Sequence, residues 1–157
     1  MAAEKKAGRP LGPTGDAVRF NIRRVRDAQG ISGVELSARL ASLDRQIPPL
    51  GIQRIEAGTR RVDVDDLAAI AVALGVSPAT LLMPHDNVEG SDVQGENDLV
   101  PGVTGWPEPV SALTAWYWLG AERPLDDDTN VVTFLTRALP PWLVPLRLEI
   151  IHFPGES

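Results

Sequence analysis

The stretch IPPLGIQRIEAGTRR, residues 47–61, contains two prolines, a short amphipathic segment, a glycine and two arginines. Pro49 suits the first position of a helix, because its missing N–H is not needed there and its φ is already restricted. Ile52 and Ile55 fall on one face of that helix, and Gly58 is placed to end it. The stretch therefore predicts a short helix followed at once by basic residues.

Two further helices are predicted before this one. The first covers about 16–29 and is ended by Gly30, a residue that tolerates the left-handed conformation of a helix cap. The second begins at Ser32, and Glu35 three positions later completes a capping box, which satisfies two backbone N–H groups. The faces expected to be buried contain Val18, Ile22, Val25, Ala28, Leu36, Leu40 and Leu43.

Two more helices are predicted after residue 61. Asp63 is placed as the N-cap of a helix that Gly75 ends, with Asp66 at its third helical position. Ser77 caps a last short helix, which Pro84 breaks. Five helices in such a short length make an all-α domain, which we assign to residues 14–84.

Charge is distributed unevenly along the chain. The formal net charge is −6, yet residues 1–83 carry +3, 84–109 carry −6 and 110–157 carry −3. Because neutralising phosphates needs a local excess of Lys and Arg, the basic first part remains compatible with nucleic-acid binding. The absence of cysteine excludes disulfides, thiolate zinc sites and cysteine nucleophiles.

The remaining chain divides into three parts. Residues 1–13 read as a disordered arm, 85–109 as an acidic linker, and 110–157 as a small Trp-rich, mostly helical accessory or dimerisation region. In that last region we expect one helix with Val110, Leu113 and Trp116 on a face. A second is capped within the aspartate run 126–128, and 144–153 fits either a strand or irregular packing.

Residues 16–84 resemble the phage repressor and Cro type of helix-turn-helix domain, also called the xenobiotic-response-element family. The resemblance rests on the segments IRRVRDAQGIS, VELSARL, IQRIEAG and DDLAAIAVALGVSPATLL. GRPLGPTG and the stretch from 47 to 67 are most similar to actinobacterial and phage members. The resemblance implies a regulator, most simply a repressor, that binds double-stranded operator DNA as a homodimer, with the helix after Pro49 in the major groove.

The resemblance also implies roles for individual residues. Base contacts fall on Arg54, Gln53, Leu50 and Pro49, and phosphate contacts on Ser32, Thr59, Arg60 and Arg61. Arg26 and Glu56 match a structural ion pair. Arg9 is the centre of a Gly-Arg-Pro core that Lys5 and Lys6 precede, and this segment resembles a minor-groove arm. Two departures stand out: Gly33 replaces a phosphate-contacting glutamine, and the segment 41–51 is about five residues longer than the common connection.

Alternative functions remain for the C-terminal region. Its tryptophans suit a small core, a dimer interface or a pocket for a small molecule, and an antitoxin-like protein would use the region to bind a partner protein. The acidic run 126–128 suits a helix N-terminus better than a metal site. We therefore expect no enzyme activity, no cofactor, no metal and no catalytic residue. With no stretch of about 18 apolar residues, we expect a soluble cytoplasmic protein that does not bind membranes.

Overall fold

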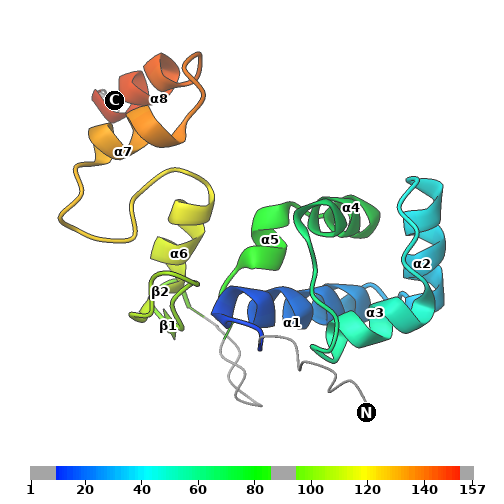
Figure 1. Ribbon diagram of the computed structural model, residues 1–157. Coiled ribbons are helices and arrows are strands. Elements are labelled where there is room, and N and C mark those ends of the chain that lie inside the picture. The colour runs from blue at the N-terminus through cyan, green and yellow to red at the C-terminus, as the bar shows by residue number, and fades with distance from the viewer. Residues whose placement is uncertain (1–9, 86–94, 153–157) are drawn as a thin grey trace, which may run out of the picture. The chain divides into compact units, whose positions relative to one another are not determined.

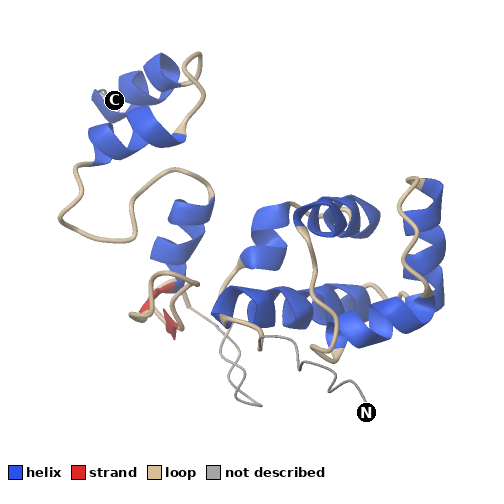
Figure 2. Ribbon diagram, viewed as in Figure 1, coloured by secondary structure: helices blue, strands red, loops and turns tan. Residues whose placement is uncertain are grey.

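The computed structural model describes residues 10–85 and 95–152 of the 157-residue chain, with side chains up to Ile150 (Figure 1). The described residues form two compact units. The first combines 10–85 with Val103–Pro107, and the second contains 95–102 and the residues from Glu108 onward. Helices dominate both units (Figure 2), which confirms the mainly α fold class. Within the described ranges, every helix is too short or too polar to span a bilayer.

In the first unit, the described chain forms the five helices expected from the sequence. They are α1 (Pro13–Ala28), α2 (Gly33–Ser42), α3 (Pro49–Glu56), α4 (Val64–Leu74) and α5 (Pro78–Leu82). α1 packs against α5 and α3, while α2 packs against α3 and α4 (Figure 1). The side chains that fill the space between them include Ile22, Leu36, Leu40, Ile52, Ile55, Ile70 and Leu81. α1 begins three residues earlier than expected, at Pro13.

The predicted helix ends are present. The Ser32 hydroxyl accepts from the Glu35 N–H at 3.1 Å, and the Asp63 carboxylate accepts from the Asp66 N–H at 2.7 Å. Gly58 closes α3 with φ of +75°, a conformation that an L side chain rarely adopts. The Glu35 carboxylate accepts from Arg39 one turn later, so it pairs along the helix surface rather than completing the capping box.

Two residues expected in the core lie outside it. Leu43 is 43% exposed, because α2 ends at Ser42 and Asp44 turns the chain with φ of +57°. Ile47, only 1% exposed, fills the core further along the connection, and its carbonyl accepts from the Ser37 hydroxyl at 2.7 Å. Ala28 in the last turn of α1 is also exposed.

The segment 85–109 is not the single unstructured linker that its composition suggests. Residues 86–94 lie outside the described residues, but β1 (Leu99–Val100) pairs antiparallel with β2 (Val110–Ser111). Between the strands, the Thr104 N–H donates to the Thr14 hydroxyl at 2.8 Å, so this part belongs to the first unit. Val100 and Val103 are buried. Polar composition concealed these few apolar residues, which are enough to order the chain.

The second unit contains α6 (Ala112–Leu119), α7 (Val131–Ala138) and α8 (Val144–His152). The interpretation of 144–153 as a strand or irregular segment is wrong, since α8 covers most of it. The N-cap of α7 is Asn130, which accepts from the Thr133 N–H at 3.1 Å, and not a residue of the aspartate run. Asp126 accepts instead from Thr129 within the preceding turn.

The tryptophans do not form one common core. Trp106 belongs to the first unit, whereas Trp116 is 44% exposed and Trp142 is 72% exposed. Small and aliphatic residues, among them Ala112, Ala115 and Leu135, are buried in the second unit. Val110 is buried as expected, but the placement of Trp116 on the buried face is wrong, because α6 turns Ala112 and Ala115 inward.

We expect Leu36→Ala to lower the free energy of unfolding by about 2–5 kcal/mol, because Leu36 is fully buried and its truncation leaves a cavity. Urea unfolding followed by circular dichroism measures the change. Val34→Ala on the same helix is the control, since Val34 is 67% exposed and its truncation should cost about 0.5 kcal/mol or less. Equal losses in the two variants would contradict this description of the core.

Candidate nucleic-acid interface

The outer face of α3 carries all four residues predicted to contact bases. Pro49, Leu50, Gln53 and Arg54 are exposed, while the intervening Gly51, Ile52 and Ile55 are buried. Such spacing places the exposed residues on one side of a helix. Leu50 is 54% exposed, so it is a surface residue and not part of the core.

Arg54 and Gln53 are available for a ligand. Among the described residues, no hydrogen bond or ion pair engages either side chain. A guanidinium can donate two hydrogen bonds to guanine, and an amide can pair in the same way with adenine. An exposed helix face with two such groups has the chemistry needed to read base edges.

Gly51 lies on the inner side of α3. A Cβ at this position would lie 2.7 Å from Nη1 of Arg60 and 3.0 Å from Cγ2 of Ile47. The glycine therefore allows close packing beneath the helix. It does not contribute to the outer face.

The predicted phosphate contacts separate into two pairs. Ser32 and Arg61 are exposed; the Ser32 oxygen accepts from the Glu35 N–H and keeps its proton to donate, while one Arg61 nitrogen donates to the Pro10 carbonyl. Thr59 and Arg60 make hydrogen bonds within the domain, although Thr59 is exposed and the Arg60 side chain is 36% exposed. The Thr59 hydroxyl donates to the Arg54 carbonyl at 3.2 Å, and Arg60 donates to Asp66. The phosphate contacts of Thr59 and Arg60 therefore stay predictions. Lys5, Lys6 and Arg9 lie outside the described residues.

Arg26 and Glu56 form the predicted structural pair. Nε and Nη2 of Arg26 donate to the two carboxylate oxygens at 2.7 and 3.0 Å, and Nη1 donates to the Ile31 carbonyl at 2.7 Å. The side chains are only 14% and 13% exposed. The hydrogen bond to Glu56 raises the pKa of Arg26 above its ordinary value. The pair joins α1 to the last residue of α3 and neutralises a carboxylate that would otherwise repel phosphate.

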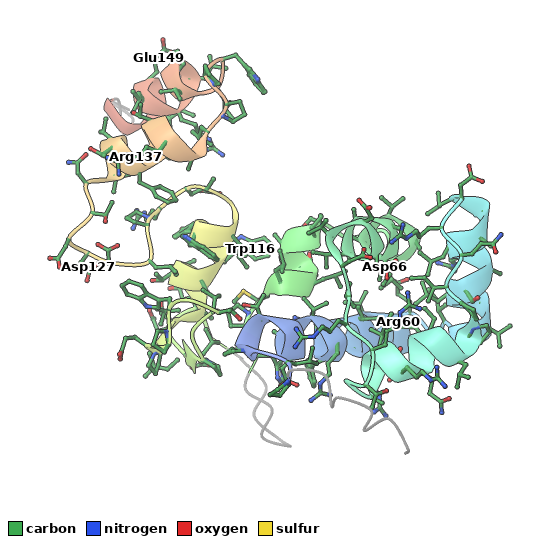
Figure 3. The ribbon with its side chains drawn as sticks, in the orientation of Figure 1. Arg60, Asp66, Trp116, Asp127, Arg137 and Glu149 are labelled. Atoms are coloured by element: carbon green, nitrogen blue, oxygen red, sulfur yellow. The ribbon has the colours of Figure 1, made fainter. Side chains whose placement is uncertain are left out.

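A second carboxylate cluster was not anticipated from the sequence. Asp66, whose side chain is 3% exposed, receives Nε of Arg45 at 2.7 Å and Nη2 of Arg60 at 3.0 Å. Asp66 belongs to α4, and Arg60, from the segment that joins α3 to α4, is labelled beside it (Figure 3). Arg45 also reaches Asp63 at 3.1 Å. The spacing of Asp63 and Asp66 indicated a helix cap, but nothing local to it pointed to arginines at positions 45 and 60.

Hydrogen bonding changes the acidity of two groups in this cluster. The hydrogen bond to Asp66 raises the pKa of Arg45 above its ordinary value. The pKa of Asp63 is lowered, first by the hydrogen bond from the Asp66 N–H and further by the nearby Arg45. Both pKa shifts favour the charged forms of Arg45 and Asp63.

α2 and α3 are joined by a six-residue connection, and the outer face of the short second helix presents Gln53 and Arg54 beside Pro49 and Leu50. This arrangement defines the class of helix-turn-helix DNA-binding domains. Comparison with known families agrees: the model described as "Helix-turn-helix" matches residues 22–81. That segment therefore carries a helix-turn-helix domain, a class of DNA-binding domain.

Other comparisons add little. No curated protein is significantly similar to the chain. One solved structure, "Crystal Structure of FeII HppE in Complex with Substrate Form 2", aligns with 64% of this chain at 22% identity and a TM-score of 0.39. The chain spans about half the length of that protein. Likeness this distant establishes neither fold nor function. Within the described residues, no three His, Asp or Glu side chains gather as a metal site would require.

We expect Glu56→Ala to destabilise the domain by about 3–5 kcal/mol, because it removes the bidentate partner of Arg26, whose side chain is only 14% exposed, and leaves it the exposed Asp27 as its carboxylate. Urea unfolding measures the change. Glu35→Ala is the matched control, since the Glu35–Arg39 pair is exposed on α2 and should contribute about 0.5 kcal/mol or less. A Glu56→Ala variant as stable as Glu35→Ala would show that the pair has no structural role.

We also expect Asp63→Asn to flatten the acid side of the stability profile. A carboxylate with a lowered folded-state pKa stabilises the fold above its unfolded pKa, about 3.9, and loses that contribution as pH falls through the folded value. Asparagine keeps the cap but not the charge. Unfolding at a series of pH values should therefore show the two proteins furthest apart at neutral pH and converging in acid. A constant difference would contradict the linkage.

Proposed function

We propose that this chain is a transcriptional regulator, acting as a repressor, that binds operator DNA sequence-specifically with α3 in the major groove. One observation carries the proposal: the outer face of α3 is exposed and unengaged while its inner face is fully packed. A helix held in this way can enter the groove without unfolding any part of the domain. DNA bound at a promoter would then block access of the transcription machinery.

Each residue on the outer face has a distinct role in this proposal. Arg54 donates to guanine, Gln53 pairs with adenine or a phosphate, and Leu50 contacts a thymine methyl group. Pro49 begins the helix at the groove edge. Ser32 and Arg61 hold the phosphates on either side, with Lys5, Lys6 and Arg9 adding contacts from the N-terminal arm.

Apolar side chains of the second unit support a protein partner as well. Trp142 is 72% exposed, Leu146 54% and Ile150 64%, and Leu146 and Ile150 lie one turn apart on α8; contiguous exposed apolar patches are typical of interaction sites. A second copy would give a homodimer that reads two half-sites. A different protein would make the chain an antitoxin-like DNA-binding module. Sedimentation of the purified chain, alone and with a co-expressed partner, distinguishes the two arrangements.

The proposal is tested by comparing DNA affinities of the wild type and Arg54→Ala. Three DNA probes are compared: a duplex that the wild type selects from a random library, the chain's own promoter region, and a random duplex. Loss of a bidentate base contact corresponds to about 1–3 kcal/mol, so the variant should lose about 5- to 150-fold in preference for the selected duplex. Arg137→Ala, on α7, is the control and should match the wild type.

Salt dependence separates base contacts from phosphate contacts. Each phosphate contact contributes about 0.9 to the log–log slope of affinity against salt, so Arg54→Ala should keep the slope of the wild type while Arg61→Ala lowers it by about one contact. A wild type with neither preference nor salt dependence would overturn the proposed function. An Arg54→Ala variant that keeps the full preference would remove Arg54 from the base contacts.

A further inference from the structure

Resting on the proposed function, a further role follows for residues that do not face the groove. We propose that Arg45, Asp66 and Arg60 are positioning residues that determine base preference by holding α3 at one angle and height against α4. Asp66 lies inside the domain, and Arg45 and Arg60 lie at its edge. None belongs to the outer face of α3.

The connection between α2 and α3 is held by contacts at both of its sides. Its six residues include Asp44, which turns the chain with positive φ, and buried Ile47. These fix the path of the backbone near α2. The Arg45 side chain then crosses to α4, where Nε donates to Asp66 and Nη2 donates to Asp63. The connection leading into α3 is thereby tied to the start of α4.

Asp66 contacts one arginine that precedes α3 and one that follows it. One carboxylate oxygen accepts from Arg45, which precedes α3, and the other accepts from Arg60, which follows it. A carboxylate this deeply buried loses its hydration and depends on both partners. One side chain of α4 therefore holds both chain segments that flank the recognition helix.

Arg60 extends from this cluster to the inner side of α3. Nη1 of Arg60 lies 2.7 Å from the position of a Cβ on Gly51, directly beneath the first turn of α3. Leu50, the neighbour of Gly51, is exposed on the opposite side. The Arg60 guanidinium therefore occupies the space beneath α3 that a side chain at position 51 would need. Bidentate base contacts weaken steeply when distance and angle change, so a small tilt reduces discrimination.

A purely structural cluster would behave differently. It would reduce the folded fraction, and the affinity for every DNA would fall by the same factor. A positioning cluster changes the ratio of affinities for selected and random duplexes in protein that is still folded. Phosphate contacts tolerate small shifts because they do not read sequence, and the affinity for random DNA should therefore persist.

The experiment uses the full chain and the selected and random duplexes, at a temperature where unfolding curves show every variant to be folded. The variants are Arg45→Ala, the conservative Arg45→Lys, and Gly51→Ala, which forces Arg60 to move. Arg39→Ala is the matched control, because Arg39 also links α2 to α4, through the Ala73 carbonyl, and leaves Asp66 untouched.

We expect Arg45→Ala and Gly51→Ala to lose about tenfold or more in preference, with random-duplex affinity within about threefold of the wild type and an unchanged salt slope. Arg45→Lys should recover part of the preference, since it keeps the charge but not the planar fork. Arg39→Ala should retain the preference. Full preference in folded Arg45→Ala and Gly51→Ala would overturn the inference, as would equal losses on both duplexes. Failure of the wild type to prefer any duplex would instead overturn the proposed function.

Discussion

An eight-residue recognition helix cannot sustain itself, and everything the domain does depends on how α3 is held. Isolated helices of this length are unstable in water, so tertiary contacts must supply the missing stability. Ile52 and Ile55 anchor its inner face in the core. Buried carboxylates then secure both ends: Glu56 joins the C-terminal end to Arg26, and Asp66 gathers the arginines on either side of the helix. The outer face is left rigid and unoccupied.

The same contacts resolve an electrostatic problem. Carboxylates close to a DNA surface repel phosphate, and removing them from water is costly unless they are paired. Glu56 and Asp66 each receive guanidinium donors, so their charges are neutralised locally and directed inward. This arrangement lets an acidic chain carry a DNA-binding face, because the negative charges near α3 are paired while Arg54 remains available.

Local signals in the sequence were sufficient for much of the first unit. Helix caps at Ser32 and Asp63, and the terminator Gly58, act over three or four residues, and periodicity placed Ile52 and Ile55 inward. Leu43 was wrongly expected in the core, because α2 ends and the chain turns at Asp44, so the helical spacing no longer applies there. α8 was missed because alternating apolar residues are equally compatible with a helix surface. In the Asp66 cluster, Arg60 and Arg45 lie 6 and 21 residues from Asp66 along the chain. No periodic pattern in the sequence predicts contacts at such separations.

Arginines in and around α3 show why residue type alone could not define the candidate site. Arg54 and Arg60 are six positions apart and share the same chemistry, yet the first is exposed without a described partner and the second lies against Gly51 with its charge paired to Asp66. Charge counting would assign both to DNA. The difference arises from the turn after Gly58, which directs Arg60 beneath the helix while Arg54 stays on its outer face. In the proposed function, discrimination between bases depends on the partly buried Arg60 as well, since it would set the position from which Arg54 acts.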